Sequence, residues 1–304
     1  MRIASLVPAA TEIACALGAG DELVAVTHDC DHPPSVRALP RLTRSTIAPG
    51  SDSAAIDRAV REAADRGEST FHLDAAALAA ARPDVLLGQT LCAVCAVTVA
   101  QLPATLDPAP AVVPLDGHTL AGILDDIARV GEAIGRAEAA AALVTGLRAR
   151  MEHVAARVAG RPRPTVVCLE WLAPLFNAGH WVPEQVALAG GDELLGRTAV
   201  PSIDVPWEAL VAADPEVLVL LPCGFDAERA LAEVPLLAER PEWAGLRAVR
   251  SGRAHVVDGN AYFSRPGPRV VDGIELLASL FHPGLVAPPA DARVLAPAAP
   301  ATRA

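Results

Sequence analysis

The sequence LGAGDEL at residues 17–23 recurs as LAGGDEL at residues 188–194, and AAARPDVL at residues 79–86 recurs as VAADPEVL at residues 211–218. Each motif lies where an alanine-rich helical pattern meets a short apolar run, which is the helix-to-strand junction of an α/β unit. The repetition predicts two similar α/β lobes. In the first copy 55 residues separate the two motifs and in the second 16, so the first lobe carries 39 additional residues.

The helices and strands around these motifs follow from hydrophobic periodicity and from capping residues. Asp74 is the expected N-cap of one helix, Pro83 follows that helix, and Gly18 closes another. Expected strands cover residues 2–7, 22–27, 84–88, 112–115 and 165–169, and expected helices cover residues 9–17, 54–66 and 75–81.

Length and composition bound the protein class. The chain has 304 residues, 52% of them hydrophobic and 20% charged, which is the composition of a folded protein with about two domains. The formal net charge of −11 disfavours nucleic acid as a partner. The longest apolar runs have the length of a strand, and none reaches the ~18 residues of a membrane span.

The N-terminal sequence and the cysteines indicate a compartment. The apolar run that follows Arg2 ends at Pro8 and is too short for a signal peptide, so a cytoplasmic location is expected, with an extracytoplasmic one as the alternative if the true start lies upstream. Six cysteines in such a chain favour thiols, metal ligands or core residues over disulfides. A monomer is expected.

One long helix divides the chain. Residues 137–158 contain no proline, one glycine and many strong helix formers, which predicts a single helix of about 30 Å. The expected organisation is an N-terminal lobe at 1–118, a connecting helical segment at 119–160, a C-terminal lobe at 161–285 and a disordered Ala/Pro-rich tail at 286–304. The fold class is α/β, with two Rossmann-like parallel-sheet lobes joined by this helix and a ligand cleft between them.

Candidate ligand-binding residues follow the predicted strands, because ligands of parallel sheets bind beyond the carboxyl ends of the strands. Aromatic residues favour the second half of the chain, which indicates a large, flat, partly apolar ligand held mainly by that lobe. The candidates are Pro8, Asp31, His32, Gln89, Glu170, Trp171, Phe176, Trp181, Cys223, Phe225, Tyr262 and Arg265.

A second set of strand-end residues has metal-ligand chemistry. His28, Cys30, Cys92 and Cys95 combine a Cys-x-x-Cys spacing with a loop that carries His and Cys, which suits zinc or another transition metal. A redox dithiol and plain structural packing are the alternatives. Sequence patterns of nucleophile elbows, phosphate loops, dinucleotide sites and zinc proteases are absent, so a binding protein is favoured over an enzyme.

The whole folded part, about residues 2–282, resembles the helical-backbone (class III) substrate-binding proteins of ABC importers, and within them the cobalamin-binding branch. The resemblance rests on IASLVPAATEI at 3–13, CDHPP at 30–34, PLFNAG at 174–179 and YFSRPGPR at 262–269. It implies a corrinoid ligand between the lobes, with Tyr262 and Phe176 against the ring and Arg265 near its amides or phosphate.

The resemblance also marks differences. His32 and Ser202 stand where cobalamin binders often carry aromatic residues. Glu208 matches a surface glutamate that docks on the permease, but Ala76 occupies the corresponding position of the first lobe. The expected function is intracellular binding of cobalamin or a precursor. The alternatives are the binding component of a cobalamin or iron-siderophore importer, and a metal- or thiol-dependent enzyme acting on a tetrapyrrole.

Overall fold

A computed structural model of the chain describes residues 1–91, 96–103 and 106–297. The chain forms two compact units. Unit 1 comprises Met1–Ser51, Arg58–Arg148 and Pro266–Pro268, and unit 2 comprises Asp52–Asp57, Ala149–Arg265 and Arg269–Ala304. Each unit has its own central sheet, as the repeat predicts.

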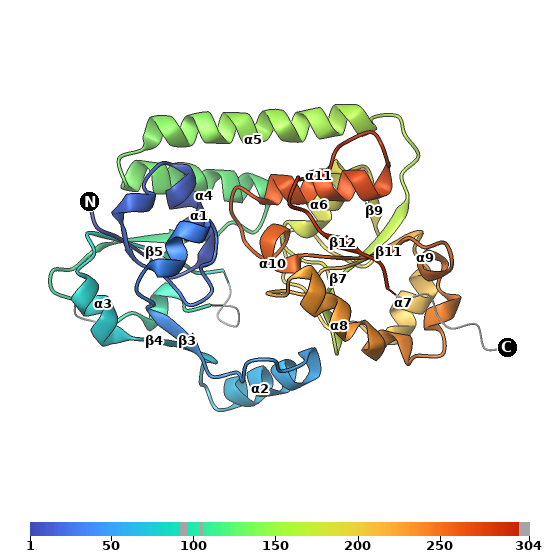
Figure 1. Ribbon diagram of the computed structural model, residues 1–304, viewed down its shortest axis with the longest axis horizontal. Helices are drawn as coiled ribbons and strands as arrows, with labels where there is room; N and C mark the ends of the chain where they lie inside the picture. The colour runs from blue at the N-terminus through green and yellow to red at the C-terminus, as the bar shows by residue number, and fades with distance from the viewer. Residues whose placement is uncertain (92–95, 104–105, 298–304) are drawn as a thin grey trace. The chain divides into compact units, whose positions relative to one another are not determined.

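The sheet of unit 1 has the strand order β2-β1-β5-β6, and every pairing in it is parallel. Figure 1 labels β5 of this sheet. Its strands are β1 (Ile3–Ser5), β2 (Leu23–Ala25), β5 (Val85–Gln89) and β6 (Ala111–Leu115). The helices of this unit are α1 (Pro8–Ala16), α3 (Ala75–Ala81) and α4 (Leu120–Ala133), with short 3₁₀ turns at Gly20–Glu22, Pro34–Ala38 and Val99–Gln101.

The additional residues of the first lobe form β3 (Thr43–Ser45), α2 (Ser53–Asp65) and β4 (Phe71–Leu73). Strands β3 and β4 pair antiparallel as a separate two-stranded sheet. The first turn of α2 packs within unit 2, where the Ser53 backbone N donates to the Glu233 carboxylate at 3.0 Å. The insertion therefore adds a small layer to unit 1 and one turn of helix to unit 2.

The sheet of unit 2 has the order β12-β11-β10-β7-β8, with β9 pairing β7. Strands β7, β9, β10 and β11 are parallel, whereas β8 and β12 run antiparallel to their neighbours. The strands are β7 (Thr165–Leu172), β8 (Leu175–Asn177), β9 (Asp192–Glu193), β10 (Val217–Leu220), β11 (Ala254–Val257) and β12 (Val294–Leu295). The helices are α6 (Val182–Leu188), α7 (Trp207–Ala213), α8 (Ala227–Ala238), α9 (Arg247–Arg250), α10 (Gly259–Tyr262) and α11 (Val270–Phe281), with a 3₁₀ turn at Trp243–Gly245.

The helix-to-strand junctions have the same geometry in both units. Helix α3 ends at Arg82 and α7 at Asp214, both in the left-handed conformation and both followed by proline. Helices α1 and α6 each end in a glycine with positive φ, Gly18 at 75° and Gly190 at 83°. Glycine adopts this conformation without the steric cost of a Cβ, which explains why both copies of the repeat carry it.

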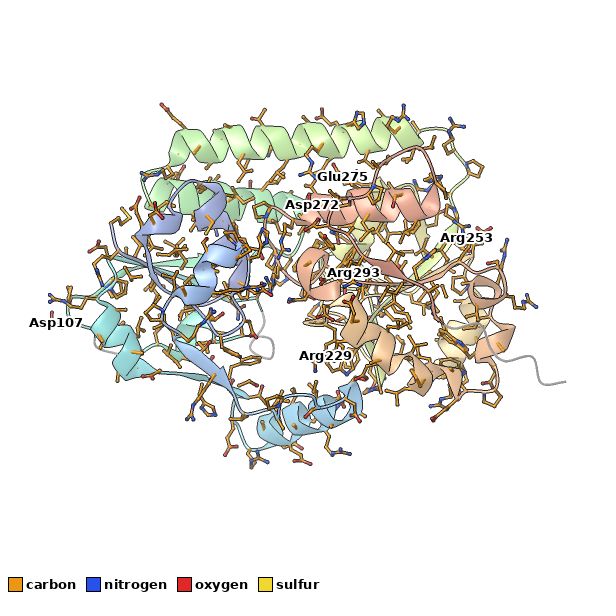
Figure 2. All side chains as sticks on the ribbon, in the orientation of Figure 1. Asp107, Arg229, Arg253, Asp272, Glu275 and Arg293 are labelled. Carbon is orange, nitrogen blue, oxygen red and sulfur yellow. The ribbon has the colours of Figure 1, made fainter. Side chains whose placement is uncertain are left out.

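The predicted long helix is α5 (Ala137–Val158), and the two-lobed α/β fold with one connecting helix is confirmed. Residues up to Arg148 belong to unit 1 and those from Ala149 to unit 2. Within unit 2, Arg150 anchors this helix to α11, where its Nε donates to Glu275 at 2.9 Å and its Nη2 pairs with Asp272. Figure 2 labels both acidic residues on α11, and both accept hydrogen bonds from Arg150.

The C-terminal segment is more ordered than its composition predicts. Val294 and Leu295 form β12 on the edge of β11, and Asp291 accepts a hydrogen bond from the Tyr262 hydroxyl at 3.1 Å. The prediction of disorder from residue 286 is therefore wrong as far as residue 297. Two apolar residues are enough here because a free strand edge supplies backbone partners. Within the described ranges, no helix combines the length and apolarity needed to cross a membrane.

Candidate functional site

In unit 1 the strand-end side chains gather around His28, which follows β2. The His28 Nδ1 lies 2.7 Å from the Thr43 hydroxyl, which also accepts a hydrogen bond from the His28 backbone N at 3.2 Å. Its Nε2 lies 3.4 Å from an Asp29 carboxylate oxygen. The ring packs on Phe71 with centroids 5.7 Å apart. Two flanking residues of the sequence-predicted loop, Asp31 and His32, are half-buried.

Cys30 lies in the interior of unit 1. Its side chain is 1% exposed, and its Sγ lies 3.1 Å from the Thr11 hydroxyl and 3.0 Å from the Thr27 hydroxyl. A buried thiol held by two hydroxyls acts as a small core residue. Across the described ranges, no three His, Cys, Asp or Glu side chains form a cluster that could hold a metal ion. Cys92 and Cys95 lie outside the described residues, so their share of the metal prediction stays untested.

Two other predicted residues of unit 1 sit at the start of α1 and the end of β5. Pro8 is the first residue of α1 and is half-buried. Gln89 is 5% exposed, and its side-chain amide donates to the Ala96 carbonyl at 3.4 Å. Pro8 thus borders the small pocket beside His28, which also involves Leu6, Thr27 and Val97, whereas the Gln89 side chain is held by Ala96.

In unit 2 the corresponding position after β7 is built around Glu170. Its carboxylate accepts a hydrogen bond from the Gly179 backbone N at 2.9 Å and another from the Ser202 side chain. Burial raises the pKa of Glu170 to about 8, and the neighbouring Cys223 acts in the same direction. A carboxyl with this pKa is largely protonated at pH 7, so it can donate a hydrogen bond to an amide or carbonyl oxygen. Cys223 is half-buried, and its backbone N donates to the Glu170 carbonyl at 2.9 Å.

Aromatic residues lie beside Glu170, but they are not equally available to a ligand. Trp171 and Phe176 are cross-strand partners on β7 and β8 and both are half-buried. The Trp171 indole N donates to the Ser53 carbonyl at 3.1 Å. Phe225 is only 2% exposed, meets Trp171 edge-on at 5.2 Å, and lies under the Arg229 guanidinium labelled in Figure 2. Phe176 takes part in none of these side-chain contacts, so its ring is the one of the three that is most available to a ligand.

The remaining predicted ligand residues of unit 2 are buried. Tyr262, Arg265 and Trp181 are 3%, 5% and 3% exposed. The Tyr262 hydroxyl donates to Asp291, and burial followed by this carboxylate raises its pKa. The Arg265 Nε donates to the Asn260 side chain at 3.2 Å. Contact of these three side chains with a ligand remains a prediction, and it requires local rearrangement.

The permease-docking prediction concerns the exposed faces of two equivalent helices. Glu208 is exposed in the first turn of α7, and Ala76 is exposed at the same position of α3. The repeat therefore places a charge on one unit and a methyl group on the other. Docking through Glu208 remains a prediction.

Sequence reasoning missed Thr43, Phe71 and Glu193. Thr43 and Phe71 pair with other residues of β3 and β4, an insertion whose contact with the strand ends carries no sequence signal. Glu193 aligns with Glu22 in the sequence repeat. That alignment gives no sign that the Glu193 carboxyl is buried. It accepts hydrogen bonds from the backbone N of Cys168, Leu195 and Gly196, and burial raises its pKa to about 7.

Comparison with known proteins gives the same fold. The model of the family described as periplasmic binding protein matches residues 3–261. The chain belongs to this family. A curated relative, the vitamin B12-binding protein of Vibrio cholerae serotype O1, is 24% identical over 276 residues, which is 90% of this chain and 86% of that protein.

Solved structures of similar fold cover nearly the whole chain. A periplasmic heme-binding protein of Pseudomonas aeruginosa has a TM-score of 0.68 at 23% identity, over 98% of this chain and 96% of its own. The periplasmic vitamin B12 binding protein of Vibrio cholerae has a TM-score of 0.66 at 22% identity, over 92% and 97%. At these identities the structures show the periplasmic binding protein fold alone.

Proposed function

We propose that this protein is the substrate-binding component of an ABC importer and that its substrate is a tetrapyrrole, with cobalamin or another corrinoid first. The observation that carries the proposal is the match to a vitamin B12-binding protein over 90% of this chain. The half-buried Trp171–Phe176 pair beside Glu170 supports it, because a flat ring with polar amide substituents needs an apolar face and a hydrogen-bond donor.

Heme is the second candidate substrate. Heme-binding proteins of Pseudomonas aeruginosa and Roseiflexus share the fold with TM-scores of 0.68 and 0.69. Heme and cobalamin both present a broad ring and a metal with axial positions, but cobalamin carries amides where heme carries two carboxylates. A protonated Glu170 favours the uncharged amide oxygens over a second carboxylate.

The comparisons favour a place outside the cytoplasm over an intracellular role. The heme-binding protein of Pseudomonas aeruginosa and the vitamin B12 binding protein of Vibrio cholerae are described as periplasmic. In that role the permease is the partner and Glu208 its candidate contact. Fractionation of cells that express the chain from its native locus tests this assignment, and recovery in the cytoplasm alone contradicts it.

Titration calorimetry of the purified protein with cyanocobalamin, dicyanocobinamide and hemin tests the substrate. We expect binding of at least one corrinoid, and tighter binding of corrinoid than of hemin. Phe176→Ala removes one aromatic face and weakens corrinoid binding about 2- to 10-fold, the value of an aromatic contact. Leu236→Ala, which removes an exposed apolar side chain from α8, is the matched control. Absence of binding of all three ligands refutes the proposal.

A further inference from the structure

Phe176 lies in a row of three side chains that crosses the edge of the sheet in unit 2. Trp171 on β7 is its cross-strand partner on one side, and Asp204 is its partner on the other side through an isolated antiparallel bridge. Side chains of residues directly opposite one another in antiparallel strands lie on the same face, with Cβ atoms about 4.5–5.5 Å apart. Trp171 and Phe176 are half-buried, and Asp204 is exposed. The row therefore passes from two aromatic rings to a carboxylate at its outer end.

The backbone that carries Asp204 is fixed to β8. The Asn177 side-chain oxygen accepts a hydrogen bond from the Ile203 backbone N at 2.8 Å, and the Ile203 carbonyl accepts one from the Asn177 backbone N at 3.1 Å. On the other side of Asp204, the Val205 backbone N donates to the Leu175 carbonyl at 2.9 Å. These bonds hold Asp204 in register with β8, as a short additional strand would be held.

The same segment reaches Glu170, because the Ser202 side chain donates to the Glu170 carboxyl. Glu170 directly precedes Trp171 on β7 and is the group whose raised pKa lets it donate a hydrogen bond to a ligand oxygen. The carboxylate of Asp204 has no proton to donate and accepts hydrogen bonds only. The two acids therefore offer opposite hydrogen-bonding functions beside the same aromatic rings.

Carboxamides and carboxylates on a ligand respond differently to such a face. A primary carboxamide has N–H groups for which a carboxylate is an acceptor, whereas a ligand carboxylate has no donor and carries the same negative charge as Asp204. Like charges held close together weaken binding, and this repulsion is a common way to reject the wrong ligand. Substituents of a flat ring project from its rim, so a ring that lies on Phe176 brings them toward the next residue of the row.

We propose that Asp204 determines the specificity of this face by accepting a hydrogen bond from a carboxamide at the rim of the bound ring and by repelling a carboxylate there. The inference rests on the proposed function and narrows its substrate class to tetrapyrroles whose rim carries amides. All the residues that carry it belong to unit 2.

Two corrinoids with the same ring and metal test this assignment. Dicyanocobinamide carries carboxamides at its rim, and dicyanocobyrinic acid carries carboxylates in their place. We expect calorimetry to show that the wild-type protein binds the amide form at least about 10-fold more tightly. Added salt should narrow this difference, because screening weakens charge repulsion more than it weakens hydrogen bonds. Hemin, which has two carboxylates, should respond to salt as dicyanocobyrinic acid does.

Two variants of Asp204 separate charge from hydrogen bonding. Asp204→Asn keeps an acceptor oxygen without the charge, so it should bind dicyanocobyrinic acid and hemin about 3- to 10-fold more tightly and dicyanocobinamide within about 2-fold of the wild type. Asp204→Ala also removes the acceptor and should weaken dicyanocobinamide binding about 3- to 10-fold. Glu239→Gln, which removes an exposed negative charge at the end of α8, is the matched control and should leave all three affinities unchanged. Urea denaturation should give both Asp204 variants nearly the stability of the wild type, since the side chain is exposed.

The outcomes distinguish this inference from the proposed function. An unchanged ratio of amide to carboxylate affinity in both Asp204 variants overturns the role of Asp204 and leaves the proposed function intact. Equal binding of the two corrinoids by the wild-type protein has the same meaning. Failure of the wild-type protein to bind dicyanocobinamide, dicyanocobyrinic acid and hemin overturns both.

Discussion

The two copies of the repeat have the same letters, Asp-Glu-Leu, but their strands pair one residue apart. In unit 1 Leu23 is the partner of Ile3, and in unit 2 Glu193 is the partner of Val166. The acidic residues that precede β5 and β10 match in the same way. The Asp84 carboxylate accepts a hydrogen bond from the Arg2 backbone N, and the Glu216 carboxylate accepts one from the Thr165 backbone N. Glu193 is therefore the structural counterpart of the buried Leu23, not of Glu22.

The shift originates at the helix ends. Helix α1 ends in Gly18 and helix α6 in Gly190, each with the two backbone bonds of a Schellman motif. Asp21 lies three residues after Gly18, whereas Asp192 lies only two residues after Gly190. A slip of one residue exchanges the two faces of a strand, so Glu193 turns inward and Leu194 is left 41% exposed. The same letters thus produce a half-buried ion pair between Glu22 and Arg136 in one unit and a buried carboxyl that accepts backbone N–H groups in the other.

Replacing Glu193 by the residue of the other unit is the strongest test of this comparison. Glu193→Leu makes the two positions alike but leaves the backbone N of Cys168, Leu195 and Gly196 without their acceptor. Each unsatisfied buried donor costs about 1–3 kcal/mol, so we expect the free energy of unfolding to fall by about 3 kcal/mol or more.

Urea denaturation monitored by tryptophan fluorescence measures this loss. Asp192→Ala, which removes an exposed ion pair with Arg163, is the control and should cost about 0–1 kcal/mol. A Glu193→Leu protein as stable as the wild type would show that the carboxyl has no structural role and that the register argument fails.

The second prediction concerns the pH dependence of stability, to which two buried glutamates of unit 2 contribute. Burial raises the pKa of Glu193 to about 7 and of Glu170 to about 8, both in unit 2. Between pH 4.5 and 8 the folded protein holds protons that the unfolded chain has released, so the free energy of unfolding decreases as pH rises through this window. The slope reaches at most about 1.4 kcal/mol per pH unit for each group.

Glu170→Gln identifies the group responsible for the upper part of that window. Glutamine still accepts from the Gly179 N and donates to the Ser202 hydroxyl, and it has no proton to lose. We expect the decrease between pH 7 and 8 to become smaller in this variant. Glu152→Gln on α5 controls for the loss of one negative charge. An unchanged slope in Glu170→Gln would mean that the carboxyl is ionised in the folded protein.

Asp84 in unit 1 and Glu216 in unit 2 occupy equivalent positions before a strand, so their removal should have similar effects on stability. Asp84 accepts the Arg2 backbone N at 2.7 Å, and Glu216 accepts the Thr165 backbone N at 2.9 Å and the Arg247 guanidinium at 2.7 Å. Asp84→Ala should cost about 1 kcal/mol, and Glu216→Ala somewhat more because a second partner is lost. The losses should add in the double variant, since the two acids share no partner. Marked non-additivity in urea denaturation would indicate coupling between the two junctions.

Helix propensity, capping residues and hydrophobic periodicity predicted most of the fold. They did not predict the environment of side chains that depends on contacts with other elements. The helix at 137–158 and the helix after Asp74 lie where propensity and capping place them. His28 and Glu170, chosen for their strand-end positions, are half-buried, whereas strand-end position did not show that Tyr262, Phe225 and Cys30 turn inward. For Tyr262 and Cys30 that direction is set by packing partners such as Asp291 and Thr11, which are distant in sequence.

The smallest expected effect concerns the left-handed residues that end α3 and α7. Arg82 has φ 43° and Asp214 has φ 36°, values that cost a non-glycine residue about 1–2 kcal/mol. Arg82→Gly relieves this strain and adds entropy to the unfolded chain at about 0.4–1 kcal/mol, so we expect a net gain in stability of about 0.5 kcal/mol.

Asp214→Gly has the same backbone benefit but removes the bond that the Asp214 carboxylate accepts from the Arg247 backbone N at 2.7 Å. Such a bond contributes about 1 kcal/mol, so this variant should be no more stable than the wild type and less stable than Arg82→Gly. The difference between the two changes in thermal unfolding then measures that one hydrogen bond, because the helix end, the following proline and the backbone conformation are shared. Equal stabilisation by both substitutions would show that the aspartate at the second junction contributes nothing beyond its backbone, and that the two copies differ only where the register does.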